Sequence, residues 1–190
     1  KAYRDGGITS NIPYVPVPGY YDVRNGVREN GLRIPVQSLG ASFLLPEKIR
    51  LTSELAHMRF SGASSGFSRW GAYLALSRQF GGWTPYISFA KTRSSGSSLD
   101  LYRAIEANAG NFPPDPLGNY QKLNADIVSP YDQWTWSVGT SYRVTTRSLL
   151  KAEWAQTRTG VVSSFIDAPS GGDSADKRLN VFSLSYSFSF

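Results

Sequence analysis

Charged side chains recur at alternate positions in segments whose other alternate positions are apolar. Along the wall of a water-filled passage, such charges bias which ions cross. Each one is also compatible with a solvated or locally paired charge on a wet surface, and for any single residue we prefer that simpler interpretation. The candidate pore-lining residues are Arg50, Glu54, Arg69, Tyr73, Lys151 and Glu153.

A second group of charges lies in the long segment 94–131. This segment carries Gly and Pro clusters and one helix-like piece, LDLYRAIEANAG, which ends at Gly110. If the segment folds inward, its charges would line a constriction, but long connections normally lie on the surface, and we prefer that reading. The possible constriction residues are Asp100, Arg103, Glu106 and Asp115.

Residues suited to catalysis or metal binding are scarce. His57 is the only histidine and there is no cysteine, so a nucleophilic triad or a metal site would depend on His57 alone. The acidic piece GDSADK, 172–177, lacks the ligand spacing of a calcium loop and fits a flexible loop tip. We therefore expect no enzyme activity, no cofactor and no metal.

Composition narrows the partners. The 190 residues carry a formal charge of +6, yet Lys and Arg are scattered without a basic run, so we expect no nucleic-acid partner. Aromatic residues make up 14% of the chain and charged residues only 18%. No apolar run approaches the length of a membrane helix, which is about 20 residues. The length suits a single domain, 1–190.

Alternation of side chains predicts strands through most of the chain. The final twelve residues, LNVFSLSYSFSF, place large apolar side chains on one face and mainly serines on the other. The same period of two recurs upstream, with Ser, Gly, Ala and Thr opposite Leu, Phe and Trp. The predicted strands are 37–45, 49–60, 69–80, 83–93, 132–143, 148–158 and 179–190.

The connections between these strands alternate in length. Short turns at 46–47, 81–82 and 144–147 are separated by longer connections at 61–68, 94–131 and 159–177. In an up-and-down barrel, this alternation puts all short turns at one end and all long loops at the other. Aromatic residues fall near both strand ends, as two interfacial belts require. The sequence therefore predicts an all-β, antiparallel, up-and-down transmembrane β-barrel.

Three segments carry a resemblance to a known family. FGGWTPYISFAKTR, WSVGTSYRVTTRSLLKAEW and NVFSLSYSFSF resemble the C-terminal half of Gram-negative general porins, and the resemblance covers 38–190. It implies passive diffusion of small hydrophilic solutes and ions across the bacterial outer membrane, with a periplasmic C-terminus and Phe190 as the assembly signal. Implied partners are the lipid bilayer, lipopolysaccharide and the barrel-assembly machinery, and a homotrimer is left open.

Seven predicted strands leave the barrel incomplete, because single-chain bacterial barrels have even strand numbers from eight upward. Either residues 1–36 form an extracellular loop and further strands lie elsewhere, or an eighth strand lies within 1–36. The small polar residues predicted to face inward would not fill an eight-stranded interior, so we favour part of a larger channel. The alternatives are a small closed barrel with a structural or adhesive role and a soluble ligand-binding β-fold. Exposed apolar faces argue against the soluble fold.

Overall fold

The structure is a computed structural model that describes residues 34–59, 68–109, 130–163 and 174–189. These residues form seven strands, one short 3-10 helix and one α-helix. The elements, in chain order, are β1 (Val36–Leu45), η1 (Pro46–Lys48), β2 (Ile49–Met58), β3 (Arg69–Arg78), β4 (Trp83–Ser94), α2 (Gly96–Ala109), β5 (Tyr131–Thr145), β6 (Ser148–Ser163) and β7 (Arg178–Phe188).

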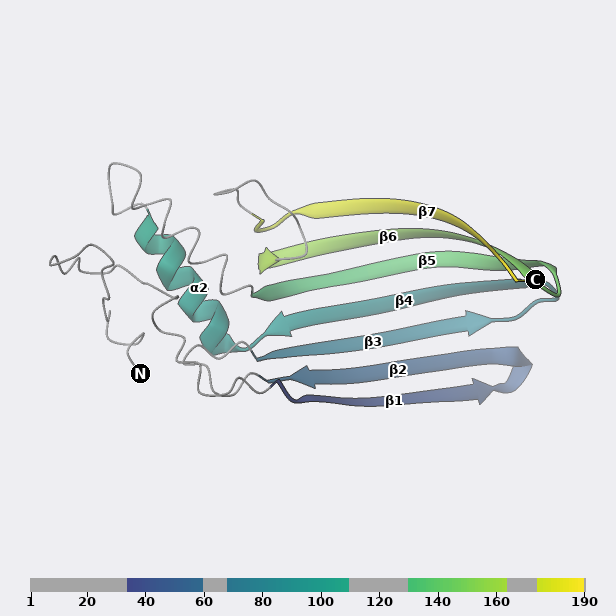
Figure 1. Cartoon of the computed structure of the whole chain (residues 1–190), viewed down its shortest axis with the longest axis horizontal. Helices are drawn as coiled ribbons and strands as arrows, with labels where there is room; N and C mark the ends of the chain where they lie inside the picture. The colour runs from purple at the N-terminus through teal and green to yellow at the C-terminus, as the bar shows by residue number, and fades with distance from the viewer. Residues whose placement is uncertain (1–33, 60–67, 110–129, 164–173, 190) are drawn as a thin grey trace, which may run out of the picture.

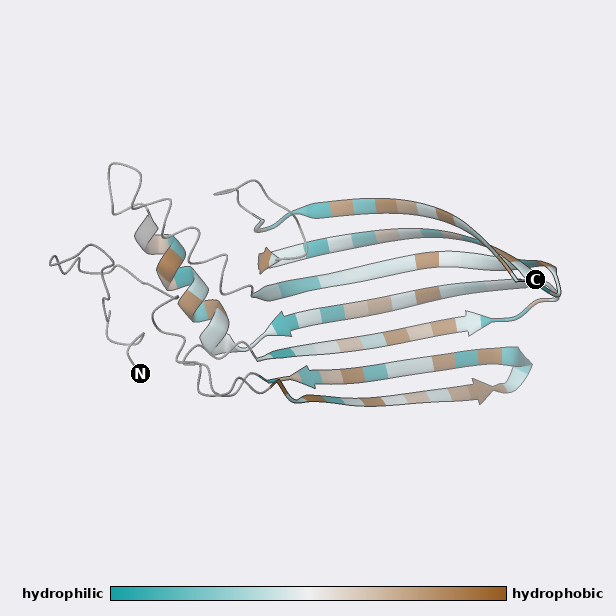
Figure 2. Cartoon of the chain, in the orientation of Figure 1, coloured by the Kyte–Doolittle hydropathy of each residue, from teal (hydrophilic) through white to brown (hydrophobic). Residues whose placement is uncertain are grey.

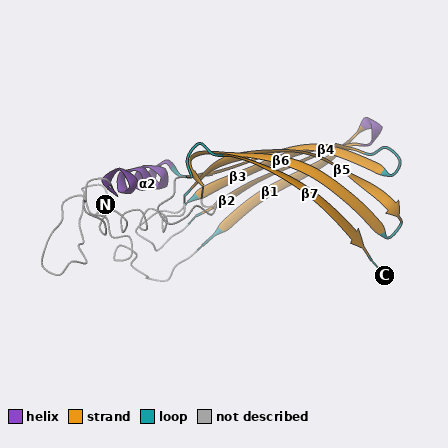
Figure 3. Cartoon of the chain, turned by 90° about the horizontal axis from the view of Figure 1, so that it is seen from above, coloured by secondary structure: helices purple, strands orange, loops and turns teal. Residues whose placement is uncertain are grey.

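All seven strands belong to one antiparallel sheet in which each strand pairs with its neighbours in the sequence (Figure 1). The prediction of an all-β antiparallel meander is therefore confirmed. The sheet is open: within the described residues, β1 and β7 are its two edges and do not pair with each other. Figure 3 shows that the strands follow a curved surface, as twisted neighbouring strands do.

The three short connections lie together at one end of the sheet, beside the C-terminus in Figure 1. Each has local chemistry that suits a tight turn. Pro46 opens η1 and Glu47 adopts a φ of 59°, while Gly81 supplies a φ of +56° between β3 and β4. The Thr145 hydroxyl accepts the Arg147 N–H at 3.1 Å in the β5–β6 turn. This end is called the short-turn end below.

At the opposite end, here called the long-connection end, the structure differs from the sequence prediction. Strand β6 continues to Ser163 instead of ending at Arg158, so Thr159 and the four residues after it are not part of a loop. A bulge makes this possible, because the pairing jumps from Gln133–Thr159 to Tyr131–Ser163. The Asp132 carboxylate accepts the Val161 N–H at 3.2 Å within the bulge.

Helix α2 explains why β6 extends. Its residues Leu99, Tyr102 and Ile105 are buried and form one hydrophobic cluster with Val162 from the extension of β6. Figures 1 and 3 show α2 beyond the strands at the long-connection end. The buried apolar core of the described residues therefore lies at this end, and the sheet contributes to it only through β6.

Figure 2 shows the alternation of hydropathy along the strands, and nearly all residues of the seven strands are exposed or only partly buried. All ten residues of β1 are exposed, and the side chains of Leu39 and Phe182 are 76% and 72% exposed. Such a surface is far more apolar than an ordinary wet sheet face. Either lipid or further protein must cover it.

Candidate functional site

Register brings the small and polar side chains of all seven strands onto a single face, here called the polar face. One row of directly paired residues runs from Ser42 on β1 through Thr52, Ala75, Ser88, Ser137 and Ala155 to Val181 on β7. All six candidate pore-lining residues share this face, because their parity on each strand matches this row. The polar face is therefore a continuous surface of hydroxyls and small residues that carries scattered charges.

A three-residue cluster stands out on the polar face. The Tyr86 hydroxyl donates a hydrogen bond to the Glu153 carboxylate, and the Lys151 ammonium lies 3.0 Å from the same carboxylate oxygen. Lys151 Nζ also lies 5.2 Å from the centre of the Tyr86 ring. This cluster neutralises two of the candidate pore-lining charges locally.

Gly139 makes this contact possible. It lies between Tyr86 and Glu153 in the same row, since it pairs with both. A Cβ at Gly139 would fall 2.5 Å from the Tyr86 hydroxyl and 2.7 Å from the Ala152 carbonyl oxygen. The tyrosine therefore reaches over β5 only because residue 139 has no side chain. Tyr86 is not among the predicted pore-lining residues, although its spacing of two from Thr84 and Ser88 places it on this face.

The other charges of the polar face are arranged differently. Arg50 donates to the Ser42 hydroxyl at 3.3 Å, and the Arg69 guanidinium lies 4.9 Å from the centre of the Tyr131 ring. Arg143, which is not among the predicted pore-lining residues, also falls on this face, four residues from Gly139 on β5. Within the described residues, no carboxylate lies within 4 Å of the guanidinium groups of Arg50, Arg69 or Arg143.

The candidate constriction residues fall on α2 or outside the described residues. Asp100, Arg103 and Glu106 belong to α2, where Arg103 Nη1 lies 3.2 Å from Asp100 Oδ1. Asp115 lies outside the described residues, as do Phe190 and most of the segment 1–36. Segment 172–177 is described only from Ser174 onward.

His57 lies on the opposite, apolar face, where its ring stacks on that of Trp70 with centroids 3.8 Å apart. No cluster of metal-ligating side chains occurs in the part of the chain that the structure describes. No helix within the described residues is long and apolar enough to cross a membrane.

The apolar face is a band of large side chains that runs across the sheet. Its central row joins Phe43, Leu51, Leu76, Ile87, Val138, Trp154 and Phe182 in direct register. Aromatic rings mark both ends: Trp83 lies 4.5 Å from Tyr142 at the short-turn end, while Trp70 lies at the long-connection end. The predicted separation of apolar and polar side chains onto two faces is therefore present across the whole sheet.

This apolar band crosses the paired rows obliquely. Phe43 and Phe182 share a row, yet the apolar side chains of β1 continue from Phe43 toward the long-connection end as far as Leu39. On β7 the next residue of that face is Asn180. Toward the short-turn end, β7 stays apolar to Phe188. The band thus shifts by about four residues across the sheet, which corresponds to strands tilted by about 25° from the normal of the band.

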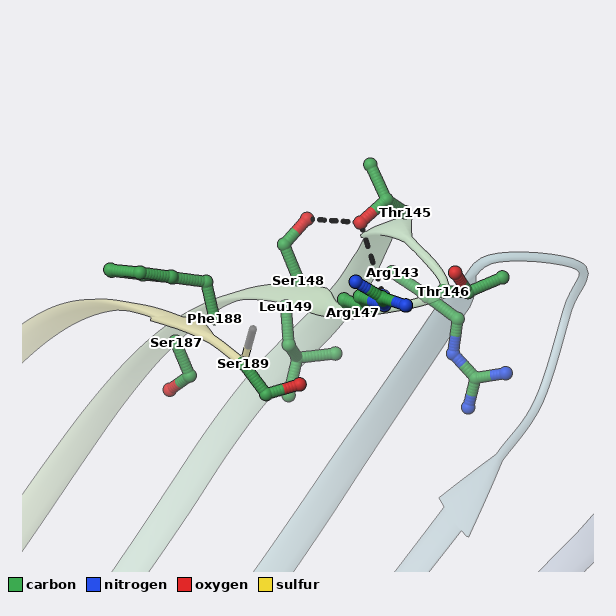
Figure 4. Close-up of a pocket in the computed structure, with 9 residues that line it drawn as sticks. All are labelled: Arg143, Thr145, Thr146, Arg147, Ser148, Leu149, Ser187, Phe188 and Ser189. Carbon is green, nitrogen blue, oxygen red and sulfur yellow. Dashed lines mark hydrogen bonds between the residues drawn. The ribbon is translucent and has the colours of Figure 1, made fainter.

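A shallow groove of about 360 Å³ lies at the short-turn end, between the β5–β6 turn and the end of β7 (Figure 4). Two arginines, Arg143 and Arg147, line it together with hydroxyl and apolar side chains. The Thr145 and Ser148 hydroxyls hydrogen-bond to each other at 2.8 Å. The described residues that line this groove include no histidine and no acidic side chain.

Comparisons of the chain with protein-family models, with curated proteins and with solved structures find no match.

Proposed function

We propose that this chain forms part of the wall of a transmembrane β-barrel channel in a bacterial outer membrane. Small hydrophilic solutes and ions diffuse passively through this channel. One observation carries the proposal: all seven strands turn large apolar side chains to one face and small polar ones to the other, and both faces are open. Lipid on the first face and water on the second satisfy both surfaces.

The tilt of the apolar band supports the same arrangement. Strands must tilt relative to the barrel axis for a sheet to close, and transmembrane barrels tilt theirs by about 35–45°. The shift of the band from β1 to β7 gives a somewhat smaller tilt of about 25°. In a soluble sheet with one solvent-exposed face and one buried face, nothing requires the apolar residues to shift steadily from strand to strand.

The open edges indicate how the wall would be completed. Both β1 and β7 run from the long-connection end to the short-turn end, because five antiparallel strands lie between them. Closing this sheet on itself would require a parallel pair. An odd number of further strands closes it with antiparallel pairs throughout, as in bacterial barrels. Ser, Gly, Ala and Thr on the polar face would leave a small barrel unfilled, which favours a wider lumen.

Transport in such a channel needs no turnover and no cofactor. Solutes keep their hydration while they pass the hydroxyl-rich polar face, and charged side chains bias ions electrostatically. The Lys151–Glu153 pair contributes no net charge, which leaves Arg50, Arg69 and Arg143 against Glu54. We propose a weak, salt-sensitive preference for anions, with the short turns and C-terminus in the periplasm.

Cysteine labelling tests this proposal, because the chain contains no cysteine of its own. Ser137 and Val138 are neighbours on β5 and point to opposite faces. In planar bilayers, a charged water-soluble thiol reagent should reduce the conductance of Ser137→Cys channels and leave Val138→Cys channels unchanged. Absence of conductance from refolded wild-type protein, or equal reaction at both positions, would refute the channel.

A further inference from the structure

A row of cations lies on the apolar face at the long-connection end. Reading across the sheet from β4 to β7, the directly paired residues are Lys91, Trp134, Arg158 and Arg178. The three cationic side chains are exposed, and a tryptophan lies between the first two. These four residues are called the basic row below.

The basic row contains an unfavourable pair. Arg158 and Arg178 lie directly opposite each other on β6 and β7, where Cβ atoms are about 5 Å apart and like charges destabilise a sheet. Within the described residues, no carboxylate lies within 4 Å of either one. Asp132 lies nearby on the same face, but its Oδ1 atom lies 3.7 Å from Arg93 Nε instead. An anion between the two guanidinium groups would remove the repulsion.

The residues next to the basic row specify what kind of anion fits. The next pair of this face toward the short-turn end, two residues along each strand, is Gln156 and Asn180, where Gln156 Nε2 donates to Asn180 Oδ1 at 3.0 Å. Two residues further along each strand, Trp154 and Phe182 begin the exposed apolar band. The face therefore changes from cations through amides to large apolar groups along the same two strands. This order matches a ligand that has a charged head and hydrocarbon chains.

We propose that the basic row binds the phosphate group of a membrane lipid whose acyl chains lie along the apolar band. Arg158 and Arg178 hold the phosphate oxygens through charge-assisted hydrogen bonds, and Lys91 adds a third cation across Trp134. The inference rests on the proposed function, because it needs the apolar face to meet a bilayer. It adds to that function a specific headgroup site at one membrane interface.

A soluble phosphate is a weaker candidate than a lipid. Guanidinium groups would attract either one, but a free anion would make no use of the apolar band that begins four residue pairs away, at Trp154 and Phe182. The arginines are also exposed at the surface instead of enclosed, so a free anion would gain only contacts screened by water and salt. Hydrocarbon chains supply the additional binding energy through burial of apolar surface.

Native mass spectrometry of the refolded protein in a neutral detergent tests the site with two lipids that differ only in the phosphate. Phosphatidic acid should be retained, and diacylglycerol with the same acyl chains should not. The double variant Arg158→Gln/Arg178→Gln should weaken phosphatidic acid binding by about tenfold or more. The matched control, Arg50→Gln/Arg69→Gln, removes the same charge from the polar face and should retain the lipid as wild type does.

Each contrary result overturns the inference in a different way. Equal losses in both double variants would show general attraction to a basic protein, and equal retention of diacylglycerol would show that the phosphate is not recognised. Displacement of phosphatidic acid by inorganic phosphate at similar concentration would show a site for soluble anions. Unchanged urea midpoints would exclude misfolding of the variants. Conductance of wild-type protein reports on the channel separately, so a conducting protein without phosphate-dependent lipid binding refutes this inference alone.

Discussion

Leu74→Arg is the most direct test of the two-face arrangement. Leu74 lies in the middle of β3 on the apolar face, and it pairs with Ser53 on one side and Phe89 on the other. If this face meets lipid, a guanidinium here lies near the bilayer midplane and costs about 2–4 kcal/mol. Such a cost lowers the folded-to-unfolded ratio by about 30-fold to nearly 1,000-fold.

Ala75→Arg is the matched control, because it introduces the same side chain one residue away, at the same depth, on the polar face. Ala75 lies between Thr52 and Ser88, and the new arginine would reach water in the lumen. Tryptophan fluorescence during guanidinium titration of the proteins folded in phosphocholine vesicles measures both stabilities. Leu74→Arg should lose about 2–4 kcal/mol of stability and Ala75→Arg less than about 1 kcal/mol. Equal losses would refute the assignment of the two faces.

Three further predictions concern packing, selectivity and orientation. Gly139→Ala should lower the free energy of unfolding by about 1–3 kcal/mol, because its Cβ collides with the Tyr86 hydroxyl, whereas Gly71→Ala, with its nearest atom 4.0 Å away, should stay near wild type in urea titrations. Arg50→Glu should move the reversal potential across a salt gradient toward cation preference, and an unchanged potential would remove Arg50 from the selectivity residues. On intact cells, an impermeant thiol reagent should label Ser97→Cys on α2 but not Thr146→Cys in the β5–β6 turn, and the opposite pattern would reverse the topology.

Much of the sheet follows from local sequence alone. A strand alternates its side chains with a period of two, so the order of apolar and polar residues in each segment fixes which of them share a face. Short turns then set the register of the hairpins: the η1 turn pairs Leu45 with Ile49, and every later pair of β1 and β2 follows from that one. The faces and the three short connections were predictable for this reason.

The long connections obey no such rule. Strand β6 extends past Arg158 because Val162 packs against Leu99 and Ile105 of α2, and the packing partners are separated from it by more than 50 residues of chain. Neither the helix position nor the bulge beside Asp132 follows from the alternation of β6. Burial against a distant element supplied the free energy that the local pattern lacks.

The candidate sites depend on two registers at once. Tyr86 meets Glu153 only because the β4–β5 and β5–β6 pairings both place Gly139 between them, and Arg158 faces Arg178 only in the observed β6–β7 register. The sequence determined which residue types lie on each face, through the period of the strand. The tertiary structure decided which of them are neighbours, because hydrogen bonding between strands aligns residues that are far apart in the chain.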